Sequence, residues 1–195
     1  MANEPTKLFW DSCVFDAYLY DQRAYDLASI EQFLVEAKHK PPGFIIYTSS
    51  FVFLEVANSK IKKPNIGSME DFVRDFVGQI IVIDSSPNVN ILAGKLRDIP
   101  YKHATTSDSH VLDAGDAVML ATALFLQEGY GVTIDEFHTF DDATKRRKVP
   151  ILSYQDWCVG LTGENELLAR RVSALKRRPP RHPAPPLIQA APIQS

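Results

Sequence analysis

The chain alternates between short, almost wholly apolar segments and longer segments with helical periodicity. Each apolar segment has the length of one β-strand, and they are KLFW (7–10), FIIYT (44–48), QIIVID (79–84), EFHTFD (136–141) and VPILSY (149–154). Strands that are apolar on both faces are typical of a parallel sheet with helices on both sides. The pattern therefore predicts an α/β protein with a central parallel sheet and three α/β/α layers.

The intervening segments have the spacing and the end signals of helices. In residues 24–40, Leu27, Ile30 and Leu34 fall on one stripe, and PPG at 41–43 ends the helix. Ser68 begins SMED, a capping-box pattern. The strongest signal is residues 113–129, rich in Ala and Leu and closed by Gly129. Further helical segments are predicted at 49–60, 69–77, 87–99 and, as a single turn, 142–148.

We expect three parts along the chain. Residues 1–160 hold the alternating strands and helices, and the 45% hydrophobic content is enough for one sizeable core. Residues 161–178 include ENELLARRVSALKRR, whose spacing predicts a C-terminal amphipathic helix. Residues 179–195 hold six prolines in seventeen positions, a composition typical of a disordered or extended tail.

The charge distribution argues against a generally basic nucleic-acid-binding protein. The net charge is −3, but residues 1–163 carry 15 basic and 22 acidic residues, a net charge of −7. The remaining residues carry six basic and two acidic side chains. An acidic domain is an unexpected partner for a polyanion unless some of its acids hold cations.

The cysteines and the N-terminal sequence bear on the cellular compartment. Cys13 and Cys158 lack the spacing of a zinc site or a disulfide framework. The N-terminal MANEPTK is polar and lacks the basic-then-apolar form of a signal peptide. No apolar run approaches the roughly 20 residues that span a bilayer. We therefore expect a cytoplasmic protein that does not associate with membranes.

Acidic residues gather where the predicted strands and one predicted helix meet. In open parallel sheets, ligands bind outside the carboxyl ends of the strands. The acids near these ends are Asp11, Glu55, Asp113, Asp116, Asp141 and Asp142. Carboxylates packed together repel one another and raise each other's pKa. A fold that gathers them is suited to hard cations such as Mg²⁺ or Mn²⁺, which prefer oxygen ligands.

Most of these acids also have a purely structural explanation. Asp113 and Asp116 fit as a cap and a dipole partner at a helix start. Asp141 and Asp142 fit as an N-cap pair before ATKRRK. Glu55 fits the solvated side of a short helix. The joint pattern favours a cation site more than any single acid does.

Four motifs together resemble the PIN-domain family in order and spacing. They are LFWDSCVFDAYL, YTSSFVFLEV, GDAVMLATAL and FHTFDDATKR, and the resemblance covers about residues 7–155. The family pattern is strand-Asp-Ser/Thr, strand-Ser/Thr with a following Glu, Asp-Ala-apolar-x-x-Ala-x-Ala, and apolar-x-Thr-x-Asp. PIN domains are α/β/α nucleases with a parallel sheet. Many are ribonucleases, including the VapC toxins of bacterial toxin–antitoxin pairs.

The resemblance implies roles for individual residues. The family's catalytic, metal-holding acids match Asp11, Glu55, Asp116 and Asp141, and further candidate ligands are Asp113 and Asp142. Ser12 and Thr139 match hydroxyl residues that orient carboxylates or water. Cys13 stands where the family often has Asn, and Asp142 competes with Asp141 for the last acidic position.

A nuclease of this kind needs basic residues to hold the substrate backbone. The preferred candidates directly follow the last acids and are Lys145, Arg146, Arg147 and Lys148. A second group, Lys62 and Lys63, lies in the segment SKIKKPN. Both runs are also typical of solvated loops.

The leading hypothesis is a Mg²⁺- or Mn²⁺-dependent ribonuclease of the PIN type, the toxin of a toxin–antitoxin pair. The resemblance implies an RNA substrate, an antitoxin partner and a homodimer. A stand-alone RNA-processing nuclease is the runner-up, because a minimal toxin needs neither the C-terminal helix nor the tail. A non-catalytic PIN-like binding module is expected to lack one or more of the four acids. A phosphotransfer protein would need a late-strand Lys, which VPILSY lacks.

Overall fold

The protein forms one five-stranded parallel sheet. The computed structural model describes residues 4–106, 108–142 and 148–183. The strands are β1 (Thr6–Trp10), β2 (Phe44–Ser49), β3 (Ile80–Ile83), β4 (Glu136–His138) and β5 (Arg177–Arg178). Their order is β3-β2-β1-β4-β5, and every pairing is parallel. The predicted parallel α/β sheet is confirmed.

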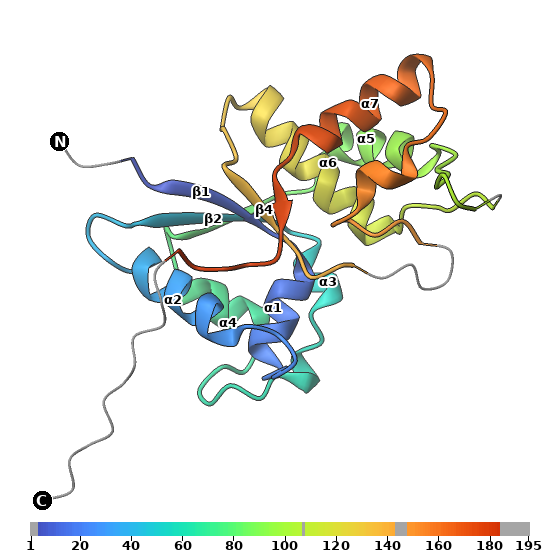
Figure 1. Ribbon diagram of the computed structural model, residues 1–195. Coiled ribbons are helices and arrows are strands. Elements are labelled where there is room, and N and C mark those ends of the chain that lie inside the picture. Colours follow the sequence, from blue (N-terminus) through green and yellow to red (C-terminus); the bar gives the residue numbers. More distant parts are fainter. Residues whose placement is uncertain (1–3, 107, 143–147, 184–195) are drawn as a thin grey trace, which may run out of the picture.

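Helices cover both faces of this sheet, which confirms the three layers (Figure 1). One face carries α1 (Ser12–Leu19), α2 (Leu27–Ala37) and α4 (Met69–Arg74). The other face carries α5 (Pro87–Arg97), α6 (Ala114–Gly129) and α7 (Gly163–Ala174). Short helices are α3 (Val52–Glu55), η1 (Asn58–Lys60) and η3 (Tyr154–Trp157). In the described part of the chain, every helix is too short or too polar to cross a membrane.

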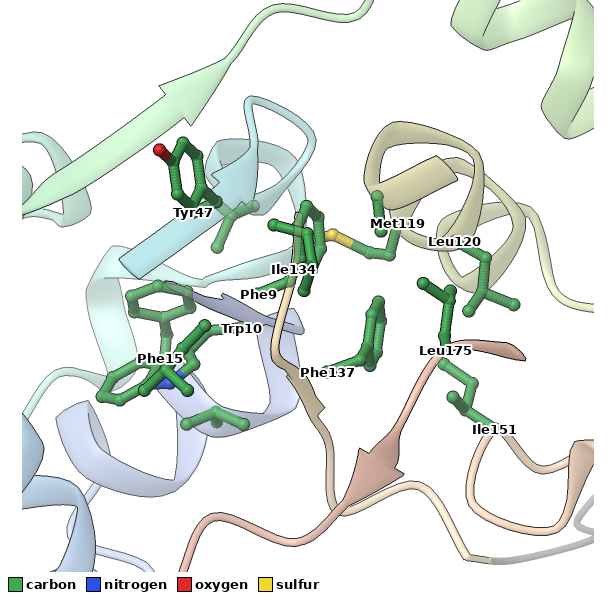
Figure 2. Close-up of a cluster of buried hydrophobic side chains, with 14 of the residues drawn as sticks. Phe9, Trp10, Phe15, Tyr47, Met119, Leu120, Ile134, Phe137, Ile151 and Leu175 are labelled. Carbon is green, nitrogen blue, oxygen red and sulfur yellow. The ribbon is translucent and has the colours of Figure 1, made fainter. Parts of the chain in front are cut away.

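The central strand β1 sends alternate side chains into two apolar layers. Phe9 stacks on Phe137 of β4 at 5.1 Å and lies on the α6 side, near Met119 (Figure 2). Trp10 points to the opposite side, where it meets Phe15 at 5.5 Å and Phe33 at 6.3 Å between ring centroids. Because both faces of β1 are buried, its end is fixed in position, and Asp11 follows there directly.

Residues 149–153 of the segment VPILSY form a largely buried loop instead of the predicted last strand, and Tyr154 begins η3. The backbone donors of the loop are used elsewhere: the N–H of Val149 donates to Val111, and those of Ile151 and Leu152 donate to Asp141. Pro150 has no N–H to give. The edge of β4 is instead paired with β5. The prediction was wrong because a short apolar run does not distinguish a strand from a buried loop.

The C-terminal segment crosses from one face of the sheet to the other. The helix predicted within 161–178 ends at Ala174, and the chain then forms β5. Beyond it, the N–H of His182 donates to Ser29 Oγ at 3.0 Å, and its ring packs against Phe33 at 4.8 Å. Residues 179–183, the start of the predicted tail, therefore pack against α2. Residues 184–195 lie outside the described residues.

Candidate metal centre

Asp11 joins the end of β1 to the start of α1. Its backbone N–H donates to His138 of β4 at 3.0 Å, and its Oδ1 accepts from the N–H of Ser12 at 2.8 Å, which caps α1. The residue is 3% exposed. Burial raises the pKa of Asp11 above its ordinary value, although hydrogen bonds from Thr139, Cys13 and Ser12 oppose the shift. A buried carboxylate held this way is oriented before any ligand arrives.

Thr139 links the acids at the ends of β1 and β4. Its hydroxyl donates to Asp11 Oδ2 at 2.7 Å and accepts from the N–H of Asp141 at 3.0 Å. The side chain is completely buried. This geometry agrees with the orienting role that the resemblance implies for Thr139.

Cys13 provides a further contact to the same carboxylate. Its thiol donates to Asp11 Oδ2 at 3.2 Å, and its sulfur accepts from the N–H of Phe140 at 3.2 Å. Burial, followed by the charge of Asp11, raises the pKa of Cys13 well above its ordinary value, so the thiol keeps its proton. Cys13, which stands where PIN domains often have Asn, therefore still supplies one hydrogen-bond donor and one acceptor.

Glu55 reaches the site from α3 and lies against the start of α6. A Cβ atom placed on Gly115 would come within 2.1 Å of Glu55 Oε1, so only glycine leaves room for the carboxylate. Burial raises the pKa of Glu55, and the charges of Asp11, Asp113 and Asp16 add to the shift. The hydroxyl of Ser12 opposes it by hydrogen bonding. No sequence pattern singled out Gly115.

Asp116 has a strongly perturbed carboxyl group. It lies in the first turn of α6, as predicted. Burial, together with the charges of Asp11, Asp141 and Asp113, raises its pKa to about 8. Carboxylates from β1, β4 and α6 therefore repel one another at the carboxyl edge of the sheet.

Asp113 and Lys148 form an ion pair beside this cluster. Asp113 caps α6 by accepting from the N–H of Gly115 at 3.1 Å, and its Oδ2 lies 2.7 Å from Lys148 Nζ. Burial acts to raise the pKa of Asp113, but the hydrogen bonds from Lys148 and the N–H of Gly115, together with the charges of Lys148 and Arg97, outweigh it and lower the pKa. Asp113 therefore caps helix α6, which is the structural explanation that its position in the sequence allowed besides metal binding. Lys148 brings a positive charge to the acids.

Asp141 is fixed on both its backbone and its side chain. Its Oδ2 accepts from the N–H of Ile151 at 3.0 Å, and its carbonyl accepts from the N–H of Leu152 at 3.0 Å. Asp142, next to it, is exposed. The charge of Asp141 contributes to the raised pKa of Asp116.

Three of the predicted substrate-binding basic residues lie in the described part of the chain, and they are Lys62, Lys63 and Lys148. Lys63 pairs with Glu31 at 3.1 Å and lies over the ring of Tyr18, 4.2 Å from its centroid. Lys62 is exposed. Lys148 is engaged with Asp113, as described above. The other predicted candidates lie outside the described residues and are Lys145, Arg146 and Arg147.

Asp16 is an additional acid near the site that sequence reasoning missed. It lies on α1 one turn after Ser12, and its Oδ1 is buried without a hydrogen-bond partner among the described residues. Burial raises its pKa, and the charge of Asp11 contributes. The four-residue spacing from Ser12 was a signal that could have identified it.

The donor chemistry fits a hard divalent cation. The groups are carboxylates, which Mg²⁺ and Mn²⁺ prefer, and Asp16 has a buried oxygen with unused acceptor capacity. Across residues 4–106, 108–142 and 148–183, no three His, Cys, Asp or Glu side chains converge closely enough to hold one ion. Three or more of these groups could therefore share one ion only after side-chain movement.

The chain matches no protein-family model, and it has no significant match among curated proteins. The fold and site define an α/β/α protein with an acidic cluster at the carboxyl edge of a parallel sheet.

Proposed function

We propose that the chain is a metal-dependent ribonuclease that hydrolyses RNA phosphodiester bonds. The observation that carries the proposal is the burial of Asp116 next to the carboxylates of Asp11, Asp141 and Asp113, which together raise its pKa to about 8. Gathering such groups is costly unless they bind a cation. The choice of RNA as the substrate follows from the resemblance to PIN domains.

The proposed ligands of Mg²⁺ or Mn²⁺ are Asp11, Glu55, Asp116 and Asp141. A bound divalent ion would supply an activated water and would stabilise the leaving oxygen of the phosphodiester. Thr139 and Cys13 orient the Asp11 carboxylate through their hydrogen bonds. Lys148 offsets part of the negative charge that would otherwise repel RNA.

Several parts of the proposal rest on the resemblance or the sequence. These are a cytoplasmic location, a homodimer and an antitoxin partner. The packed C-terminal segment supports the alternative of a stand-alone RNA-processing nuclease, because residues 163–183 form part of the folded domain. A non-catalytic binding module is less well supported, since it would have no use for a complete acidic set.

The proposal is tested by incubating the purified protein with mixed RNA and with single-stranded DNA in Mg²⁺, Mn²⁺ or EDTA. We expect cleavage of RNA with either metal and no cleavage in EDTA. Cleavage that persists in EDTA would contradict the metal dependence. Absence of RNA cleavage under every metal condition would contradict the nuclease.

Gly115→Ala is expected to lower RNA cleavage about 10-fold with little loss of stability. The added methyl group displaces the Glu55 carboxylate, which is the flexible end of a side chain, so the free energy of unfolding changes by less than about 1 kcal/mol. Activity assays and urea denaturation measure the two effects.

Gly94→Ala is the matched control, because Gly94 lies in helix α5 with nothing within 4 Å of an added Cβ. We expect Gly94→Ala to gain about 0.5–1 kcal/mol of stability without a change in activity. Full activity in Gly115→Ala would show that the position of Glu55 does not matter.

A further inference from the structure

The side chain of Arg177 in β5 donates several hydrogen bonds, all of them to uncharged acceptors. Nε donates to the carbonyl of Ile151 at 2.9 Å, and Nη1 donates to the carbonyls of Val172 and Leu175. Nη2 donates to Oε1 of Gln155. The guanidinium is half-buried, and no carboxylate forms an ion pair with it within the described ranges. Its fixed fork of donors therefore holds backbone and amide groups in place.

One of these acceptors belongs to a peptide group that also holds Asp141. The carbonyl of Ile151 accepts from Arg177, and the N–H of the same peptide group, that of Leu152, donates to the carbonyl of Asp141 at 3.0 Å. The preceding N–H, that of Ile151, donates to Asp141 Oδ2 at 3.0 Å. Arg177 thus fixes the turn from which Asp141 takes both of these hydrogen bonds.

The backbone of β5 reaches the other side of Asp141. The carbonyl of Arg178 accepts from the N–H of Thr139 at 3.1 Å. The hydroxyl of Thr139 in turn accepts from the N–H of Asp141 and donates to Asp11. The short C-terminal strand therefore supports Asp141 through a side chain on one side and a peptide carbonyl on the other.

We propose that Arg177 is a positioning residue for Asp141. In this way the C-terminal segment, which lies outside the acidic site, helps to hold the site in place. This role rests on the proposed function, in which Asp141 is a metal ligand. Burial lowers the pKa of Arg177, because the partly desolvated guanidinium has lost hydration. The hydrogen bonds to the carbonyls of Ile151, Val172 and Leu175 offset this cost only while the turn keeps its conformation.

The test compares full-length wild type with Arg177→Met and Arg177→Lys. Arg170→Met is the matched control, because Arg170 is an exposed arginine that pairs with Glu166 on the surface of α7. Three properties are measured on each folded protein. They are hydrogen exchange of the amides of Ile151 and Leu152, Mn²⁺ affinity by calorimetry, and kcat and KM for RNA cleavage.

In Arg177→Met we expect the two amides to exchange at least about 10-fold faster, with exchange in β1 and β2 unchanged. We expect about 10-fold weaker Mn²⁺ binding and about 10-fold lower kcat with KM nearly constant. Arg177→Lys should show smaller changes in all three properties, because Lys keeps the positive charge but lacks the planar set of donors of the guanidinium. Arg170→Met should match the wild type.

The outcomes separate this role from the proposed function. Unchanged exchange at Ile151 and Leu152 in Arg177→Met would overturn the positioning role, whatever the activity. Faster exchange with unchanged Mn²⁺ affinity and kcat would make Arg177 a purely structural residue and would also overturn the role. A wild type that neither binds Mn²⁺ nor cleaves RNA would overturn the proposed function, and the positioning role with it.

Discussion

Asp116→Asn is expected to lower the rate of RNA cleavage by on the order of 10³-fold while leaving the protein folded. Asp116 lies in the first turn of α6, where its charge meets those of Asp11 and Asp141. The amide keeps the size of the side chain and removes the charge that a metal ligand must supply. Initial rates on a labelled RNA in Mn²⁺, with circular dichroism as a check on folding, measure the effect.

Asp98→Asn is the control for this prediction, because Asp98 is an exposed residue at the end of α5 and loses the same charge. We expect Asp98→Asn to keep the wild-type rate. Cleavage by Asp116→Asn at more than a tenth of the wild-type rate would remove Asp116 from the catalytic set.

In EDTA, the free energy of unfolding is expected to fall by about 2 kcal/mol between pH 6.5 and pH 8.0. The pKa of Asp116 is raised to about 8 in the folded protein, whereas in the unfolded chain it is near the ordinary value of 3.8. Over this range the unfolded chain has already released the proton that the folded protein still holds. Raising the pH therefore favours unfolding until the folded carboxyl has also ionised.

Between pH 6.5 and pH 8.0 the contributions of His138 and Cys13 to the pH dependence are small. Below this window, the lowered pKa of buried His138 makes stability rise with pH, because the unfolded chain binds the extra proton. Above it, the raised pKa of the Cys13 thiol adds its own loss of stability. Urea denaturation across the window should give a slope in the wild type and in Asp98→Asn, and a clearly smaller slope in Asp116→Asn, where the raised pKa values of Asp11 and Glu55 still contribute. A wild-type free energy of unfolding that does not change with pH across the window would contradict the raised pKa of Asp116.

Much of the fold could be predicted because its central strands are apolar on both faces. Leu8, Phe9 and Trp10 are completely buried between two helical layers, and this fixed both the strand and the place of Asp11. The Ser68 cap was also predictable, since its Oγ accepts from the N–H of Asp71 at 3.0 Å. These features depend on local pattern, which a sequence carries directly.

The features that could not be predicted depend on contacts between distant segments. A strand of two arginines has no apolar pattern, and β5 forms because β4 offers a free edge. The space that Glu55 needs at Gly115 joins residues 60 positions apart, and nothing local in either helix indicates it. The acids themselves were identified from their positions at strand and helix ends, whereas the hydrogen bonds that orient Asp141 come from a loop first assigned as a strand.

Calorimetric titration of Mn²⁺ into the metal-free protein at pH 7 tests most directly whether the acids form a divalent-metal site. We predict binding in the wild type and at least about 100-fold weaker binding in Asp116→Asn. Because the pKa of Asp116 is about 8, binding should also release about one proton, seen as a buffer-dependent heat. No binding heat in the wild type, or equal affinity in Asp116→Asn, would show that the acidic cluster is not a metal site.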